Sequence, residues 1–224
     1  MIITIDGPAG AGKTTVARGL AKRLSIAYLD TGATYRAVTL AAIQAGVDLK
    51  DDKALAELAE RIDLRLDYTH GDMQVILNGS DVSEQIRSSE VSEKSHYIAR
   101  CPKVRGILVN LQRRIAKHLL QSTGGVVAEG RDQGTVVFPD ADLKFYLDAS
   151  CQVRADRRYK EMLSRGQQAD YQQVLQAIRT RDERDRSREV APLTKPPDAI
   201  EIDTTNMTAD EVVEKLYQYA RAVG

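Results

Sequence analysis

The chain has 224 residues, of which 42% are hydrophobic and 29% are charged, as in globular proteins with a sizeable core. Basic and acidic residues both number 32, so the formal net charge is zero and does not point to nucleic acid or to an anionic membrane. The two cysteines lack CxxC spacing, no leader precedes the first apolar segment, and no apolar run approaches the roughly 20 residues that cross a bilayer. These features predict a soluble, cytoplasmic protein with a single domain over residues 1–224.

A strand, a glycine-rich loop and a helix are predicted at the beginning of the chain. Residues 2–5 are all β-branched and mostly apolar, and they are followed by the turn-forming residues 6–8. From Lys13 onward, apolar residues recur at helical spacing while basic residues occupy the other faces. A second strand at residues 27–29 and a second helix at residues 34–45 repeat this order.

A small antiparallel insertion is predicted in residues 63–82. Two short apolar segments there are separated by a turn-like stretch at residues 69–72, and Asn78-Gly79 gives a second turn.

The rest of the chain alternates between helices and strands. Helices are predicted at residues 89–99, 103–121, 152–165, 171–188 and 208–223, and strands at residues 126–128, 143–147 and 199–202. This alternation favours an α/β fold with a central, mostly parallel sheet between two helix layers, in which ligands bind at the carboxyl ends of the strands.

The segment GPAGAGKT at residues 7–14 matches the phosphate-binding pattern G-x-x-x-x-G-K-[ST], and it lies between a predicted strand and a predicted helix. Backbone N–H groups and the helix N-terminus favour phosphate oxygens, Lys13 adds a cation, and the Thr14 hydroxyl is placed to bind Mg²⁺. The predicted ATP-binding residues of this loop are Gly7, Pro8, Ala9, Gly10, Ala11, Gly12, Lys13, Thr14 and Thr15. A GTPase is disfavoured because residues 194–198 lack the asparagine of a guanine-binding motif.

Arginines gather in motifs near predicted element ends, as phosphoryl transfer requires, because charge spreads over several phosphate oxygens in its transition state. These motifs are DTGATYR at residues 30–36, PKVR at 102–105, EGRD at 129–132 and RDERDRSR at 181–188.

Read in order, the chain resembles bacterial cytidylate kinases over nearly its whole length. The resemblance lies in IDGPAGAGKTT, LDTGATYRA, NGSDVSEQIR, AEGRDQGTVVFPDA, FYLDAS and RDERDRSREVAPL. It implies a P-loop nucleoside monophosphate kinase fold, with an acceptor-binding insertion at about residues 60–100 and a short LID at about residues 154–168. It also implies transfer of the γ-phosphoryl group of ATP to CMP or dCMP, with Mg²⁺ as cofactor, by a monomer.

The resemblance assigns roles to residues of the matching motifs. Thr31, Arg36, Arg105 and Arg131 would hold the phosphate and base of the acceptor, and Asp132 and Asp185 would accept hydrogen bonds from its sugar hydroxyls. Arg181 and Arg188 would reach the phosphate or base side of the same acceptor.

Three arginines of the predicted LID helix would close over ATP and exclude water. Arg154 and Arg158, together with Lys13 and Arg131, are the predicted catalytic residues, and Arg157 is a predicted ATP-binding residue. Without the family resemblance, these arginines would be interpreted as a solvated helix face that pairs with Glu161.

The sequence departs from the family pattern at two positions. Glu129 ends a predicted strand where the family usually has Asp, and His96 stands where a small hydroxyl residue is common near the cytosine. The departure at His96 leaves the choice of base open. Alternative functions are kinase activity on another small acceptor such as UMP or shikimate, and a nucleotide-binding module that transfers nothing, which loss of the acceptor arginines would have favoured.

Overall fold

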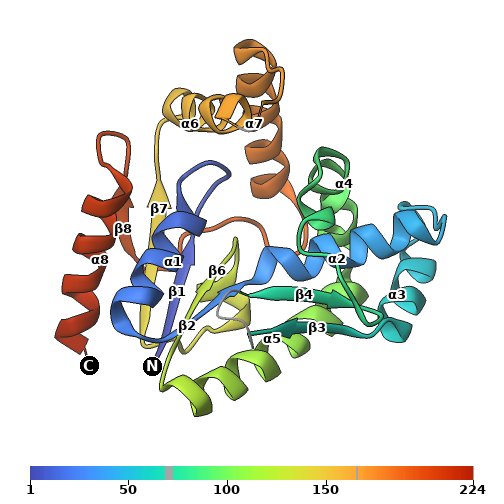
Figure 1. Cartoon of the computed structure of the whole chain (residues 1–224), viewed down its shortest axis with the longest axis horizontal. Coiled ribbons are helices and arrows are strands. Elements are labelled where there is room, and N and C mark those ends of the chain that lie inside the picture. The colour runs from blue at the N-terminus through green and yellow to red at the C-terminus, as the bar shows by residue number, and fades with distance from the viewer. Residues whose placement is uncertain (69–72, 165, 224) are drawn as a thin grey trace. The chain divides into compact units, whose positions relative to one another are not determined.

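Two sheets organise the structure, a computed structural model that describes residues 1–68, 73–164 and 166–223. The larger sheet is parallel and has the strand order β2-β6-β1-β7-β8 (Figure 1). Its strands are β1 (Ile2–Asp6), β2 (Ala27–Asp30), β6 (Val126–Glu129), β7 (Leu143–Asp148) and β8 (Ile200–Asp203). The predicted α/β fold with a parallel sheet and a small antiparallel insertion is confirmed.

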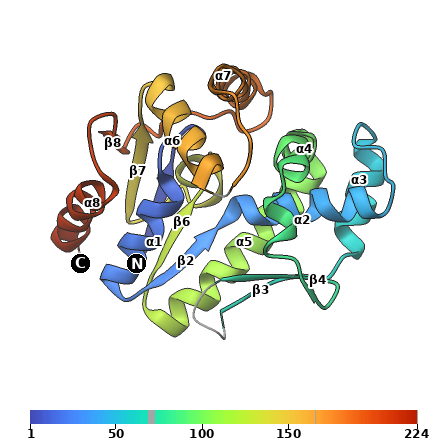
Figure 2. The ribbon, with the colours of Figure 1, turned by 45° about the horizontal axis from the view of Figure 1, so that its top comes forward.

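The chain divides into two compact units, Met1–Tyr28 with Leu120–Gly224, and Leu29–Leu119. In the first unit, α1 (Lys13–Leu24) and α8 (Ala209–Val223) lie side by side against the sheet (Figure 2). Ile5, Leu20 and Leu216 are completely buried there. The core forms because central parallel strands are apolar on both faces, while each helix contributes one apolar stripe.

The backbone of Gly7, directly after β1, lies against the backbone of β7. A Cβ atom at Gly7 would be 2.0 Å from the carbonyl oxygen of Leu147, and φ of Gly7 is +146°. We expect Gly7→Ala to lower the free energy of unfolding by about 3 kcal/mol, because a steric clash adds to an unfavourable φ. Urea denaturation measures this loss.

Gly46→Ala is the matched control for that substitution. Gly46 has φ of +65° but nothing within 4 Å of an added Cβ, so this variant should lose only about 1 kcal/mol. Equal losses in the two variants would contradict the steric explanation at Gly7.

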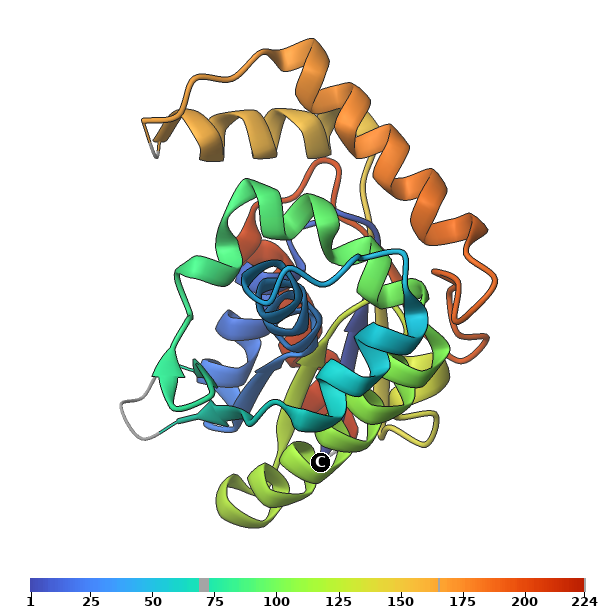
Figure 3. The same ribbon diagram turned by 90° about the vertical axis from the view of Figure 1, so that its right-hand side faces the viewer.

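The helices α6 (Cys151–Ser164) and α7 (Tyr171–Ser187) pack side by side within the first unit (Figure 3, yellow and orange). Ala155 and Ile178 are buried between them, and the rings of Tyr159 and Tyr171 meet edge to face at 5.9 Å. Asp170 caps α7 by accepting a hydrogen bond from the backbone N–H of Gln173. Within the predicted LID, residue 165 lies outside the described residues.

The second unit contains its own core and the smaller sheet. Val38, Leu55, Ile98 and Leu108 are among its buried apolar residues. Its elements are α2 (Thr31–Gln44), α3 (Asp52–Arg61), β3 (Leu64–Asp67), β4 (Gln74–Leu77), β5 (Ser80–Asp81), η1 (Gln85–Arg87), α4 (Ser89–Arg100) and most of α5 (Pro102–Thr123).

The three antiparallel strands of the second unit confirm the predicted insertion. Asn78 and Gly79 have φ of 49° and 83°, as a tight turn between β4 and β5 requires. The Asn78 side chain also accepts a hydrogen bond from the backbone N–H of Asp63. The turn predicted at residues 69–72 lies outside the described residues.

Two helices of the second unit differ from the sequence prediction. The second helix begins at Thr31 rather than at residue 34, because the Asp30 carboxylate caps its first turn through the N–H of Ala33. Helix α3 was not predicted at all, although Asp51 caps it and Leu55 is buried beneath it. Across the described residues, no helix is both long and apolar enough to cross a membrane.

Candidate active site

The glycine-rich loop joins β1 to α1 and places Lys13 at the first residue of the helix. Lys13 is 6% exposed, and its Nζ donates a hydrogen bond to the carbonyl oxygen of Pro8 at 2.7 Å. Gly10, Thr14 and Thr15 are exposed on the same segment. The loop therefore combines a buried cation with an accessible helix N-terminus, which is the arrangement that binds anionic phosphates.

Lys13 belongs to a buried cluster of charged side chains at the carboxyl ends of β1 and β6. Burial lowers its pKa well below the ordinary value, and the Arg131 guanidinium lowers it further. Glu129 and Asp185 oppose this effect but do not cancel it. A phosphate group would therefore stabilise the charged form of Lys13 strongly.

Asp6 positions the segment that follows the EGRD motif. Its two carboxylate oxygens accept hydrogen bonds from the backbone N–H groups of Gln133 and Gly134, at 2.9 and 2.8 Å. That segment forms a short π-helix, η2 (Gln133–Val137), which the sequence did not predict. Burial raises the pKa of Asp6 to about 6, although these two N–H groups and Lys13 oppose the shift.

The raised pKa of Asp6 predicts how stability depends on pH. The ordinary pKa is 3.8, so between about pH 4 and 6 the folded chain keeps a proton that the unfolded chain has released. Stability therefore falls as the pH rises through this window, by roughly 3 kcal/mol at about 1.4 kcal/mol per unit. Asp6→Asn lacks this titrating group. As the pH rises through the window, the free energy of unfolding of the variant should therefore increase relative to that of the parent by the same amount. Urea titrations across the window measure the difference, and a constant difference would contradict the prediction.

Arg131 and Asp185 form a mostly buried ion pair. Arg131 Nε donates to Asp185 Oδ2 at 2.8 Å, and the side chains are 19% and 16% exposed. Burial alone raises the Asp185 pKa, but Arg131, Arg181 and Arg188 outweigh burial and hold it below its ordinary value. Asp132, the residue that follows Arg131 in the sequence, is also buried. The structure thus brings together three predicted catalytic or acceptor residues, Lys13, Arg131 and Asp185, through direct contact or electrostatics.

The end of α7 is folded back by the residues that follow it. Arg188 Nε donates to the carbonyl oxygen of Ala191, and the N–H of Leu193 donates to the carbonyl oxygen of Asp185 at 2.7 Å. Arg181 is exposed, yet its charge acts on both Lys13 and Asp185. Thus the motif at residues 181–188 directs positive charge toward the same cluster.

Glu129 has a partner that sequence reasoning missed. Its carboxylate accepts a hydrogen bond from the Tyr28 hydroxyl, and the Arg18 guanidinium lies 5.2 Å from the Tyr28 ring centroid. Glu129 is only 5% exposed. Tyr28 therefore anchors the longer carboxylate that replaces the usual Asp.

The three predicted LID arginines have different surroundings. Arg154 is buried and contacts the phosphate loop, where its Nη1 donates to the carbonyl oxygen of Ala9 at 3.0 Å. Arg157 donates to the hydroxyl and carbonyl of Thr204. Arg158 pairs with Glu161 at 2.8 Å on an exposed face. The structure thus brings only Arg154 into direct contact with the loop.

The remaining predicted acceptor residues lie in the second unit. Arg36 pairs with Asp30 at 2.8 Å. The Arg105 guanidinium lies 5.4 Å from the Tyr35 ring centroid, and its Nη1 donates to the carbonyl of Ala99. Thr31 is buried, and its carbonyl accepts from the Thr34 hydroxyl. Gln112, absent from the predicted set, donates to that hydroxyl at 2.9 Å.

His96 lies in α4. Its Nδ1 is 2.8 Å from the carbonyl oxygen of Glu93, and its ring centroid is 4.1 Å from that of Tyr97, with the two rings tilted by 35°.

The site consists of a phosphate loop between a strand and a helix, with a buried lysine beside an Arg–Asp pair. This arrangement defines a P-loop protein that binds nucleotide phosphates. The family model described as cytidylate kinase matches residues 3–222. The chain therefore belongs to the cytidylate kinase family.

Curated relatives are similar along nearly their whole length. A protein named cytidylate kinase from Caldanaerobacter subterraneus subsp. tengcongensis is 48% identical over 219 residues, covering 98% of this chain and 94% of the relative. Cytidylate kinase 1 of Haemophilus influenzae is 45% identical over 224 residues, covering 100% and 95%. A crystal structure of an uncharacterized protein from Eubacterium ventriosum has a similar fold, with a TM-score of 0.53, 15% identity, and coverage of 99% and 98%.

Proposed function

We propose that this protein transfers the γ-phosphoryl group of ATP to CMP or dCMP and releases ADP with CDP or dCDP. The observation that carries the proposal is the buried cluster in which Lys13 of the phosphate loop and the Arg131–Asp185 pair act on one another. Family membership supports the choice of acceptor.

The chemistry requires placement and charge rather than a covalent intermediate. The loop would hold the ATP phosphates, while Lys13 and Arg131 would stabilise charge that develops on the transferred group. The attacking atom is an oxygen of the acceptor phosphate. Because the second pKa of a phosphate monoester is about 6, this oxygen needs no general base near neutral pH.

The acceptor would be recognised by hydrogen bonds of matched polarity. Carboxylates accept only, so Asp185 and Asp132 suit the hydroxyls of a sugar. Guanidinium groups donate in a planar fork, which suits a phosphate, so Arg131, Arg181 and Arg188 are proposed for the acceptor phosphate or base. The same roles are proposed for Thr31, Arg36 and Arg105 of the second unit.

Magnesium fits the oxygen donor at the start of α1. Thr14 is exposed in the first helical turn, next to Lys13, and its hydroxyl is the kind of hard ligand that Mg²⁺ takes together with waters and phosphate oxygens. Bound there with ATP, Mg²⁺ would neutralise charge on the β- and γ-phosphates. Thr14 is the residue of this chain that we propose as its ligand.

Roles for the helix α6 follow from its contacts. Arg154 already touches the loop and is proposed to act on the transferred phosphoryl group. Arg157 and Arg158 are proposed to reach ATP, which would require them to leave Thr204 and Glu161. Action as a monomer in the cytoplasm stays a prediction.

A coupled assay of ADP release tests the proposed function. ATP and Mg²⁺ are supplied with CMP, dCMP, UMP, AMP or shikimate in separate reactions. Release with CMP and dCMP alone is the expected result. Equal release with UMP would favour a broader pyrimidine kinase, and tight ATP binding without release for any acceptor would favour a nucleotide-binding module.

A further inference from the structure

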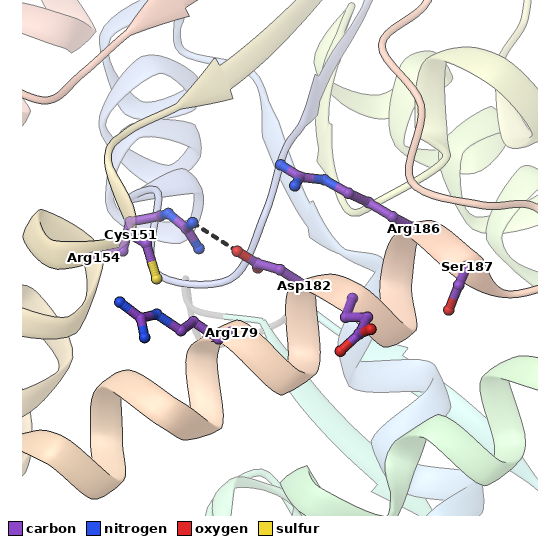
Figure 4. Close-up of a pocket in the computed structure, with 7 residues that line it drawn as sticks. Cys151, Arg154, Arg179, Asp182, Arg186 and Ser187 are labelled. Carbon is purple, nitrogen blue, oxygen red and sulfur yellow. Dashed lines mark ion pairs between the residues drawn. The ribbon is translucent and has the colours of Figure 1, made fainter.

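Asp182 of α7 is a buried carboxylate that the proposed chemistry does not use. It is 6% exposed, and its Oδ2 atom lies 2.6 Å from Nη2 of Arg154 (Figure 4). Its Oδ1 atom is buried and has no hydrogen-bond partner in the described part of the chain. Among the described residues, the ion pair with Arg154 is therefore the polar contact of the Asp182 carboxylate.

Arg154 makes two further hydrogen bonds, one of them to the phosphate loop. Its Nε donates to the carbonyl of Ala149, just after β7, at 2.9 Å, and its Nη1 donates to the carbonyl of Ala9 in the loop at 3.0 Å. A Cβ atom at Gly10 would lie 3.0 Å from the Cβ of Arg154 and 3.1 Å from its carbonyl oxygen. The start of α6 thus packs directly against the backbone of the loop, so the guanidinium orientation and the loop position depend on each other.

Asp182 joins this arrangement to the acceptor motif. It lies one residue after Arg181 and three before Asp185, a spacing that places Asp182 and Asp185 on neighbouring faces of one helical turn. Asp185 in turn pairs with Arg131 at 2.8 Å. One turn of α7 therefore holds two arginines, of which one contacts the loop and the other belongs to the Lys13 cluster.

The Arg154–Asp182 pair also faces a pocket of about 500 Å³ between α6 and α7 (Figure 4). Arg179, Glu183 and Arg186 contribute to the same lining. Both side chains of the pair are buried, but one side of the pair borders the open space of the pocket. An anionic ligand in the pocket would meet the N–H groups of Arg154 that Asp182, Ala149 and Ala9 leave unused.

We propose that Asp182 is a positioning residue for phosphoryl transfer: it orients the Arg154 guanidinium on the phosphate loop and ties it to the turn of α7 that carries Asp185. The inference rests on the proposed kinase function and adds a residue to it. Asp182 acts through Arg154 and does not itself touch a substrate.

Asp182→Asn is the first test, because it removes the charge and keeps the size. We expect kcat with ATP and CMP to fall about 10- to 100-fold, since small misplacements of a catalytic group have effects of this size. KM for ATP and for CMP should change less than about threefold, because the binding groups stay. Asp210→Asn is the matched control: Asp210 is exposed in α8, lies outside the lining of the pocket and loses the same charge, so its kcat should stay unchanged.

A double-mutant cycle separates positioning from structure and remains informative if Asp182→Asn does not fold. The cycle compares the parent with Asp182→Leu, Arg154→Met and the double variant Arg154→Met/Asp182→Leu. Asp182→Leu alone should lower kcat, whereas Arg154→Met and the double variant should have the same kcat, because Asp182 has nothing left to orient. A further loss of kcat in the double variant would overturn the inference. So would a parental kcat in a folded Asp182→Asn variant whose melting temperature alone has dropped. If the parent protein is inactive with every acceptor, both the proposed function and this inference are wrong. If the parent is active and Asp182→Asn has the same kcat, only the inference is wrong.

Discussion

Lys13→Met should lower kcat by about 10²- to 10³-fold or more, which corresponds to roughly 3–4 kcal/mol of transition-state stabilisation. Lys13 is the cation at the start of α1, and its Nζ is held on the carbonyl oxygen of Pro8. Methionine keeps the apolar stem and removes the charge that would face the phosphates. Steady-state ADP release with CMP as acceptor measures the loss.

The stability of this variant should move in the other direction. Burial and Arg131 lower the Lys13 pKa, which means that the folded protein without nucleotide destabilises the charged amine. Removing the amine should therefore leave the melting temperature equal or higher. Lys22→Met, on the exposed face of the same helix, is the control and should retain activity. A variant at Lys13 that kept near-normal turnover would show that the loop assignment is wrong.

Arg131→Met should have the second large effect, a fall in kcat/KM for CMP of about 10²- to 10³-fold. The side chain is mostly buried, and it pairs with Asp185 through Nε at 2.8 Å. Its removal takes away a donor to phosphate and also leaves the Asp185 carboxylate without its main partner. The dissociation constant for ATP, measured by calorimetry, should change far less than the kinetic constants for the acceptor.

Arg131→Lys distinguishes geometry from charge at this position. Lysine keeps the positive charge for Asp185, so it should recover stability, but it lacks the planar fork that binds a phosphate by two parallel bonds. We expect activity to stay low in this variant. Arg184→Met, which replaces an exposed arginine of α7, serves as the control. If Arg131→Lys restored full activity, a simple cation would suffice and the proposed phosphate contact would be wrong.

The elements that local sequence determines were predicted well. The strand, loop and helix around Lys13 have short-range causes, namely β-branched residues, positive-φ glycines and helical periodicity. The Asn78-Gly79 turn is equally local, because both residues tolerate positive φ. Helix α3 escaped prediction because only three of its residues are buried and its charged remainder resembles a loop.

The features that could not be predicted depend on residues far apart in the chain. Asp6 bonds to Gln133, which is 127 positions away, and no periodicity reveals such a contact. The partnership of Tyr28 with Glu129 and that of Arg154 with Asp182 have the same origin. Motifs could indicate which arginines matter, whereas the carboxylates that orient them became visible only in the folded chain. The individual roles of the site residues remain predictions until the variants are measured.

The π-helix η2 makes the length of its segment a constraint in its own right. In this turn the N–H groups of Val137 and Phe138 bond to carbonyls five residues earlier, so the turn contains one residue more than an α-helical turn. A deletion of one residue between Asp132 and Val137 could still close a helical turn. The Asp6 carboxylate would then meet a different pair of amides. Insertions and deletions in this stretch should therefore be tolerated far less than substitutions of its exposed side chains.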